Sequence, residues 1–155
     1  MNDRELILDA MRRMGKTVAE SVQVRSTSMS GTELNAEDDY IPTFRAAVTH
    51  MNMLERPIGF VCKSTAGRVV RLLQPYDSEI YTQEPEELSA QFGFVWSTDP
   101  KKAKPFAALS TSPYNTGECC LNKAGEPRRS KIDNNVFDPD ASPEYWEDPY
   151  SEEGM

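Results

Sequence analysis

The sequence has no long hydrophobic run and no recognisable leader. None of its apolar stretches approaches the roughly 20 residues that a membrane-spanning helix needs, so a transmembrane protein is not expected. The first 16 residues, MNDRELILDAMRRMGK, mix charged and apolar positions and contain no small-residue cleavage site. We therefore expect no secretory signal, and such a chain would reach the outside of a cell within a particle or after lysis.

Histidine and cysteine are scarce. His50 is the single histidine, and the three cysteines, Cys62, Cys119 and Cys120, include no CxxC pair. An odd number of cysteines excludes a fully paired disulfide framework. The count allows a zinc site made of His50 and all three cysteines, but the spacing lacks the paired ligands of zinc motifs. We expect neither a metal ion nor a cofactor.

The motifs of nucleophilic catalysis and nucleotide binding are also missing. The sequence has no GxSxG, and His50 has no recognisable catalytic partner. AMRRMGKT (10–17) differs from a phosphate-binding loop by Ala10 in place of the first glycine, but it continues a helical pattern instead of following a strand. With 25 acids, carboxylate pairs are unavoidable and do not indicate a glycosidase. We expect a protein that is not an enzyme.

Basic residues are outnumbered by acids. The chain has 17 Lys and Arg against 25 Asp and Glu, a net charge of −8. Surfaces for nucleic acid or for anionic membranes need an excess of positive charge, so neither partner is expected. The acids gather at the end, where PEYWEDPYSEEGM carries five acids and no base. Residues 148–155 are predicted to form an acidic flexible tail.

An amphipathic helix is predicted over residues 2–24. Asn2 and Glu5 form the pattern of a capping box, and Gly15 is a point where the helix is expected to kink or break. A single helix of this length cannot bury its apolar stripe, so it packs on the body of the chain, on other copies or on a carrier protein. The apolar positions with helical spacing are Leu6, Ile7, Ala10, Met11, Met14, Val18 and Val22.

A second capping box, SGTE at 30–33, predicts a short second helix, and residues 1–39 are assigned to helical attachment or oligomerisation. From about Tyr40 onward, prolines and glycines separate short apolar runs such as PIGFVCK and FGFVW, which have the length of strands. Residues 40–146 are therefore predicted to form mostly short antiparallel strands and long loops, with little helix. The expected fold is mainly β: two small tandem antiparallel modules behind an N-terminal helix.

Two segments of the chain are similar to each other. GFVCKSTAGRVVR (59–71) and GECCLNKAGEPRR (117–129) are identical at five of thirteen positions, where ordinary composition gives about one chance identity or fewer. Each contains an Ala-Gly pair suited to a tight hairpin. We expect a duplicated unit, with modules at 40–100 and 101–147. The identical pairs are Gly59/Gly117, Cys62/Cys120, Ala66/Ala124, Gly67/Gly125 and Arg71/Arg129.

The repeat also predicts the positions of the cysteine side chains. Cys62 and Cys120 occupy equivalent positions and are expected to face the core of a small sheet. Cys119 should point to the opposite face, because neighbours on a strand alternate. Phe92 and Trp146 close the two segments and are expected in the core, whereas Trp96, between the segments, could be core or surface.

The second segment resembles the carbohydrate-binding modules of the chitin-binding type 3 group, families five and twelve. Over residues 114–147 it matches their order of a tyrosine, a glycine, two short strands around a glycine turn, an asparagine, a proline and a closing tryptophan. The first segment fits less completely, because it lacks the opening aromatic residue. Similar tandem copies behind an N-terminal helix occur in bacteriophage and prophage tail-region proteins. The matching residues are Tyr114, Gly117, Gly125, Asn134 or Asn135, Pro139 and Trp146.

Two departures separate this chain from the family. Arg128 or Arg129 stands where the family has an aromatic residue, and the exposed tryptophans that bind chitin there have no clear match. The fold of the family thus carries over better than its specificity for chitin.

The resemblance implies a non-catalytic carbohydrate-binding protein of a phage tail or virion that recognises a bacterial surface glycan. Other phage structural proteins, or further copies joined through the N-terminal helix, are the protein partners expected. Sugar recognition uses flat aromatic faces with amides or carboxylates beside them, and such residues follow each hairpin. The alternative is a structural virion or accessory protein whose modules make protein–protein contacts. The candidate binding residues are Tyr76, Asp77, Tyr81, Asp133, Asn134, Asn135 and Phe137.

Overall fold

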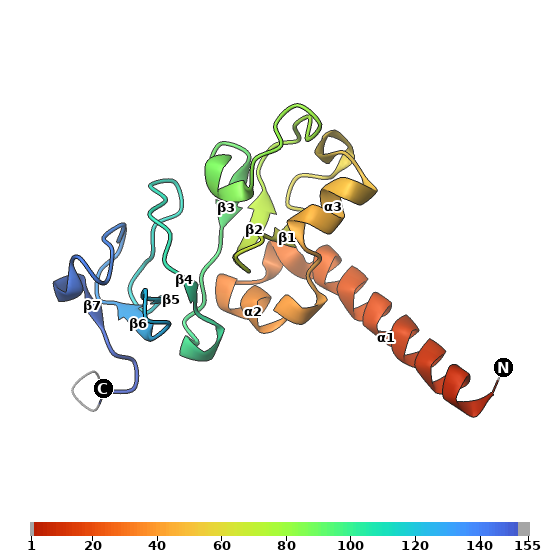
Figure 1. The fold of residues 1–155 in the computed structure, drawn as a ribbon, viewed down its shortest axis with the longest axis horizontal. Coiled ribbons are helices and arrows are strands. Elements are labelled where there is room, and N and C mark those ends of the chain that lie inside the picture. Colours follow the sequence, from red (N-terminus) through yellow and green to blue (C-terminus); the bar gives the residue numbers. More distant parts are fainter. Residues whose placement is uncertain (1, 152–155) are drawn as a thin grey trace.

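The computed structural model describes residues 2–151 as a long helix followed by a body that contains two small sheets (Figure 1). Of the described residues, 36% are helical, 3-10 turns included, and 17% are in strands or bridges, a mixed α/β fold, so the prediction of a mainly β fold is wrong. The helix α1 begins at one end of the molecule, and strand β7 lies at the other (Figure 1). None of the described helices is both long and apolar enough to cross a membrane.

The described α-helices all lie in the first third of the chain, whereas short 3-10 turns occur along its whole described length. The α-helices are α1 (Asp3–Arg25), α2 (Gly31–Ala36) and α3 (Phe44–His50). The 3-10 turns are η1 (Ser26–Ser28), η2 (Asp38–Tyr40), η3 (Met53–Glu55), η4 (Pro85–Glu87), η5 (Pro100–Lys102) and η6 (Pro143–Tyr145).

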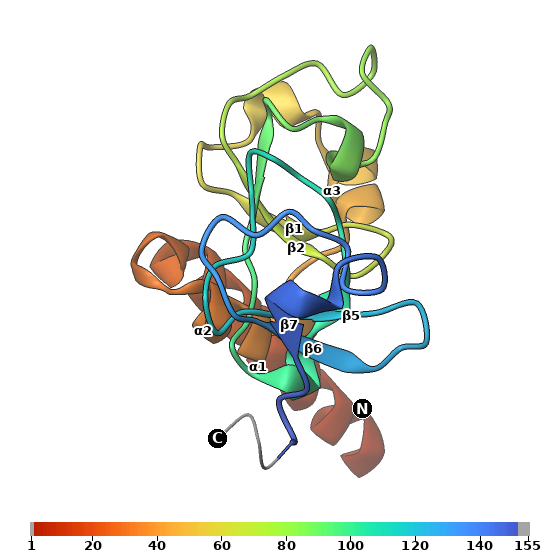
Figure 2. The ribbon, with the colours of Figure 1, turned by 90° about the vertical axis from the view of Figure 1, so that its left-hand side faces the viewer.

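The strands form two sheets of similar construction. The first has the order β1-β2-β3 and is antiparallel; the second has the order β4-β5-β6-β7, with β4 parallel to β5 and the remaining pairs antiparallel. Figure 2, which looks at the β7 end, shows β5, β6 and β7 in front of β1 and β2. The strands are β1 (Val61–Lys63), β2 (Val69–Leu72), β3 (Phe92–Phe94), β4 (Lys104–Pro105), β5 (Cys119–Leu121), β6 (Pro127–Ser130) and β7 (Trp146–Glu147).

The two predicted helix starts are confirmed, and the predicted kink in the first helix is wrong. Asn2 with Glu5, and Ser30 with Glu33, form reciprocal capping boxes. The helix α1 continues through Gly15 from Asp3 to Arg25. A single glycine costs a helix only about 1 kcal/mol, which the packing of the last turns of α1 on the body outweighs.

Residues 40–146 were expected to contain little helix, and helix α3 is the largest departure from that expectation. Thr43 caps its start through its side chain, which accepts a hydrogen bond from the backbone N–H of Ala46. Phe44 and Ala47, one turn apart, are buried in the core. A stretch of seven residues contains only two buried positions of a helical pattern, and this is too little periodicity to separate a helix from a loop in the sequence.

The two hairpins predicted from the repeat have the same register. Cys62 pairs with Val70 in the first, and Cys120 pairs with Arg128 in the second, a constant separation of 58 residues. The glycines that begin and turn each hairpin, Gly59, Gly67, Gly117 and Gly125, all have positive φ. A glycine adopts this backbone conformation without a steric cost, which explains why these four positions recur.

The similarity between the units extends upstream of the hairpins, where the sequence shows little identity. The turns η2 and η5 are separated by 62 residues. After η2, Thr43 forms a parallel bridge with Lys63; after η5, Pro105 pairs in parallel with Leu121 at the equivalent place. Each unit therefore consists of a 3-10 turn, a short parallel segment, a hairpin and a third antiparallel strand.

The outer edge of the first strand in each hairpin, β1 or β5, is hydrogen-bonded to a different kind of group in the two units. In the second unit, the backbone N–H of Cys119 donates to Ser97 O at 2.8 Å. In the first unit, the amide of Gln23 on α1 pairs with Val61, at the position of β1 that is equivalent to Cys119. Gln23 Nε2 donates to Val61 O at 2.7 Å, and Val61 N donates to Gln23 Oε1 at 3.0 Å. This amide fixes the end of α1 to the first sheet.

One aromatic core runs through both units. The rings of Trp96 and Tyr114 stack with centroids 4.2 Å apart, and Tyr114 also contacts Phe106 and Trp146. Trp96 is 3% exposed, and the predicted core residues Phe92 and Trp146 are buried as well. A smaller core beneath α1 joins Val22, Leu34 and Ile41 to the opposite face of β1 and β2. The two units thus stabilise each other.

Loss of the Gln23 amide should destabilise the protein. Gln23→Ala leaves the buried N–H and C=O of Val61 without partners, and we expect a loss of about 2 kcal/mol in the free energy of unfolding. Urea denaturation measures this change. Gln83→Ala, in an exposed loop, is the control and should not change the urea concentration at the midpoint of unfolding. An unchanged midpoint for Gln23→Ala would contradict the role of the amide.

The contact between α2 and the segment after β3 predicts a second stability difference. A Cβ at Gly31 would lie 2.4 Å from Trp96 O, a backbone atom, whereas a Cβ at Gly93 would meet only the exposed side chain of Leu73 at 3.2 Å. Gly31→Ala should therefore cost about 2 kcal/mol through overpacking, and Gly93→Ala should cost much less. Thermal unfolding of both variants checks this, and equal melting temperatures would refute it.

Candidate functional site

The loops between the second and third strands of each unit carry all the candidate residues. In the second unit this loop runs from Lys131 to Tyr145. Its centre is fixed by Asn135, which is fully buried: its backbone pairs with Tyr114, and its side chain donates to Ser130 Oγ at 2.9 Å and to Tyr145 O at 3.3 Å. Asn134, just before it, has a positive φ of 55° and is exposed.

Phe137 presents the best-defined exposed aromatic surface of this loop. Its ring stacks on Tyr145, with centroids 4.3 Å apart and an interplanar angle of 24°, and the residue remains 41% exposed. Its backbone is held on both sides: Phe137 N donates to Asn135 Oδ1 at 3.0 Å, and Trp146 Nε1 donates to Phe137 O at 2.8 Å. The ring is thus stacked on one neighbour, and both polar groups of its backbone are hydrogen-bonded.

The polar residues around this platform differ in their freedom to bind a ligand. Asp133 Oδ1 accepts a hydrogen bond from the backbone N–H of Thr116 at 3.0 Å, which lowers the pKa of that carboxyl and keeps it ionised. Asn134 N donates to Asn115 Oδ1 at 3.1 Å, which fixes its backbone. Asp133 and Asn134 are exposed, whereas the amide of Asn135 is committed to the fold.

The candidate binding residues of the first unit differ in how far they are exposed to solvent. Tyr76 is 6% exposed and packs edge-on against Phe92 in the core. Asp77 Oδ1 accepts from Asn52 Nδ2 at 2.9 Å, and this hydrogen bond lowers the pKa of the Asp77 carboxyl. Tyr81 is 51% exposed, beside Ile80 at 70%. Tyr81 is therefore the one candidate of the first unit with an aromatic face open to solvent.

Tyr145 was missed by reasoning from the sequence. Its ring stacks on that of Phe137, but it lies in the turn η6, directly before the closing tryptophan, and only that tryptophan was singled out from the sequence. No short pattern in the sequence places the two rings together, because Phe137 and Tyr145 are eight residues apart in a loop without regular periodicity.

The three cysteines lie in the interior of the protein. All three are buried and free, and Cys62 and Cys120 face the same aromatic core, as predicted. Desolvation raises the pKa of Cys62 to about 12 and that of Cys119 to about 11, and it also raises the pKa of Cys120. Among residues 2–151, no group of three His, Cys, Asp or Glu side chains is placed to hold a metal ion.

The buried thiols should be unreactive while the protein is folded. At pH 8 a thiol whose pKa is raised stays protonated, and only the thiolate is a good nucleophile. Ellman's reagent should label less than one thiol in the native protein and three after denaturation in guanidinium chloride. Rapid labelling of the native protein would show that the hairpins open or that the cysteines are exposed.

Comparison of the chain with protein-family models, with curated proteins and with solved structures gave no match. The function must therefore be argued from the surfaces of the molecule itself.

Proposed function

We propose that the protein is a non-catalytic glycan-binding protein whose principal contact is the ring of Phe137. The observation that carries the proposal is the stacked Phe137–Tyr145 pair, an exposed aromatic face fixed in position by stacking and by two hydrogen bonds to its own backbone. The order of motif residues over 114–147 resembles that of carbohydrate-binding modules and favours the same class of ligand, although no family model matches the chain.

A fixed aromatic face suits the apolar side of a pyranose ring. Aromatic side chains bury a large area when a flat partner covers them, and a rigid platform loses little conformational entropy on binding. Hydroxyl groups at the edge of the sugar need donors and acceptors close by. The exposed side chains of Asn134 and Asp133 on the same loop supply an amide and a carboxylate.

Tyr81 gives the first unit a second, weaker contact. It is exposed on the equivalent loop, but no described aromatic ring stacks against it in the way that Tyr145 supports Phe137. Two weak sites on one chain, or sites on several copies, raise the overall affinity for a polymer through their effective concentration. A polysaccharide of a bacterial surface is such a polymer, and a phage tail or virion that held many copies of this chain would present many such sites.

The alternative function, a structural protein that makes only protein contacts, is favoured by α1. Its outer half exposes large apolar side chains such as Met11 and Met14, at 64% and 70%. This surface is far from the loops of the two units (Figure 1). Protein association through α1 and glycan binding through Phe137 can therefore be tested separately.

Retention on insoluble polysaccharide tests the glycan proposal. We expect the intact protein to bind chitin, peptidoglycan or another bacterial wall polysaccharide, and Phe137→Ala to lose about tenfold or more in retention, because stacking on one ring contributes about 1–3 kcal/mol to comparable contacts. Phe137→Tyr should retain binding. Tyr150→Ala, an exposed aromatic outside the loop at 62% exposure, is the control and should bind normally.

The folded state of each variant is checked by circular dichroism. Phe137 is partly exposed, so its truncation should leave the fold intact. If the intact protein is retained on none of these polysaccharides and on no glycan of an array, the proposal fails. If Phe137→Ala binds as well as the intact protein and Tyr81→Ala does not, the first unit is the binding site and Phe137 is not.

A further inference from the structure

The outer half of α1 carries an apolar face that nothing in the described chain covers. Ile7, Met11 and Met14 are 61%, 64% and 70% exposed, and their spacing of three and four residues continues inward to Val18 and Val22, which pack on the core beneath α1. Residues three and four apart lie on one side of a helix. The face that binds the body thus extends beyond the body into solvent.

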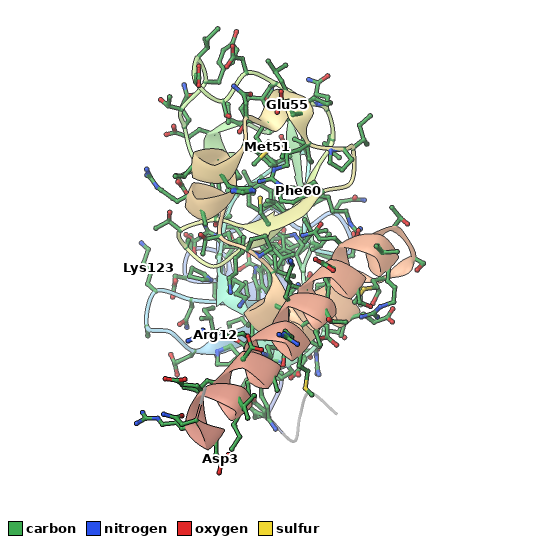
Figure 3. All side chains as sticks on the ribbon, turned by 90° about the vertical axis from the view of Figure 1, so that its right-hand side faces the viewer. Asp3, Arg12, Met51, Glu55, Phe60 and Lys123 are labelled. Atoms are coloured by element: carbon green, nitrogen blue, oxygen red, sulfur yellow. The ribbon has the colours of Figure 1, made fainter. Side chains whose placement is uncertain are left out.

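A second row on the same helix leads into a groove. Leu8, Met11, Gly15 and Ala19 also follow a spacing of three and four residues, and Gly15 and Ala19 line a groove of about 770 Å³. The groove lies between α1 and the segment that holds η2 and α3, and Figure 3 looks at this side of the molecule, with α1 crossing the body below α3. A Cβ at Gly15 would meet nothing within 4 Å, so another backbone can approach closely there.

The groove is lined by apolar side chains and by charges of both signs. Ile41, Ala47 and Phe60 line it, together with the charged residues Lys16, Glu20, Asp39 and Arg56 and with His50. The Arg56 guanidinium lies 4.5 Å from the centre of the Phe60 ring and donates to Ala47 O at 2.9 Å, and its buried Nε has no hydrogen-bond partner. An apolar segment suits this lining, and an acid on that segment would supply the acceptor that Arg56 Nε lacks.

The charges of α1 are divided along its length. Residues 2–9 carry three acids and one base, a net charge of −2, and residues 10–20 carry three bases and one acid, a net charge of +2. The charged residues are Asp3, Arg4, Glu5 and Asp9 in the first part and Arg12, Arg13, Lys16 and Glu20 in the second. An antiparallel pair of such helices places opposite charges side by side, whereas a parallel pair places like charges together.

We propose that a second copy of this chain docks on α1 in antiparallel orientation, along the row from Leu8 to Ala19, with its acidic first turns in the groove. The antiparallel direction carries the partner's Asp3 and Glu5 toward Lys16, His50 and Arg56. The arrangement has twofold symmetry, so each copy fills the groove of the other and the assembly closes as a dimer. The apolar residues Leu8 and Met11 are buried at its centre.

Sedimentation equilibrium of the full chain tests the interface. We expect a dimer at about 100 μM, the concentration range of a modest apolar interface, and a monomer for Met11→Asp at the same concentration. Leu6→Asp is the matched control, because Leu6 is 53% exposed on the same turns but belongs to neither row. A monomeric intact protein, or a Met11→Asp variant that stays dimeric, overturns the proposal.

Two further variants test the orientation and the groove. The triple variant Arg12→Gln, Arg13→Gln and Lys16→Gln removes the three bases together and should weaken the antiparallel dimer about tenfold. A tighter dimer would overturn that orientation, since it would mean that these charges repel each other in the assembly.

Ala46→Glu adds bulk and negative charge to the groove at an exposed position of α3 and should also weaken the dimer about tenfold. An unchanged dissociation constant for Ala46→Glu overturns the placement of the acidic turns.

Discussion

The stacking of Trp96 on Tyr114 is the contact on which the body of this protein depends. Trp96 follows the last strand of the first unit, and Tyr114 precedes the hairpin of the second, so a single pair of rings joins both halves of the chain. The indole N–H donates to Ser112 O at 2.9 Å, which satisfies the one polar group of the buried ring. Neither unit, with strands of two to four residues, has enough apolar surface to fold well alone. Their shared aromatic core supplies what each lacks.

Polar contacts then fix the angle at which the units meet. Asp38 of the first unit accepts hydrogen bonds from Lys102 and Lys104 of the second, at 3.0 and 2.6 Å. Arg68, on the first hairpin, donates to the backbone oxygens of Pro105 and Phe106. These groups are mostly removed from solvent, so each charge or carbonyl depends on its partner. These contacts join the unit that carries the Phe137 loop to the unit on which α1 packs.

Local signals in the sequence predicted local structure well. The capping residues Asn2 and Ser30 gave the starts of two helices, and the recurring glycines gave both hairpins, because each of these features acts over a few residues. The prediction of the fold class was wrong because α3 and the 3-10 turns are stabilised by tertiary contacts of single residues such as Phe44, which the sequence does not reveal. In the candidate site, the position after each hairpin made Phe137 and Tyr81 candidates but could not separate these exposed residues from the buried Tyr76 and Asn135. Burial depends on the whole core, and no short pattern around those two residues reveals it.

The amide of Gln23 has a consequence for the behaviour of the chain in crowded solution. The edge of a sheet is a template on which another chain can add a strand, and β1 would present such an edge if α1 ended one turn earlier. A side-chain amide offers one donor and one acceptor, as a peptide group does, yet it belongs to a helix and cannot be extended by a further strand. Gln23 therefore occupies the place at Val61 where a further strand would pair, so another chain could add to β1 there only after this amide had left.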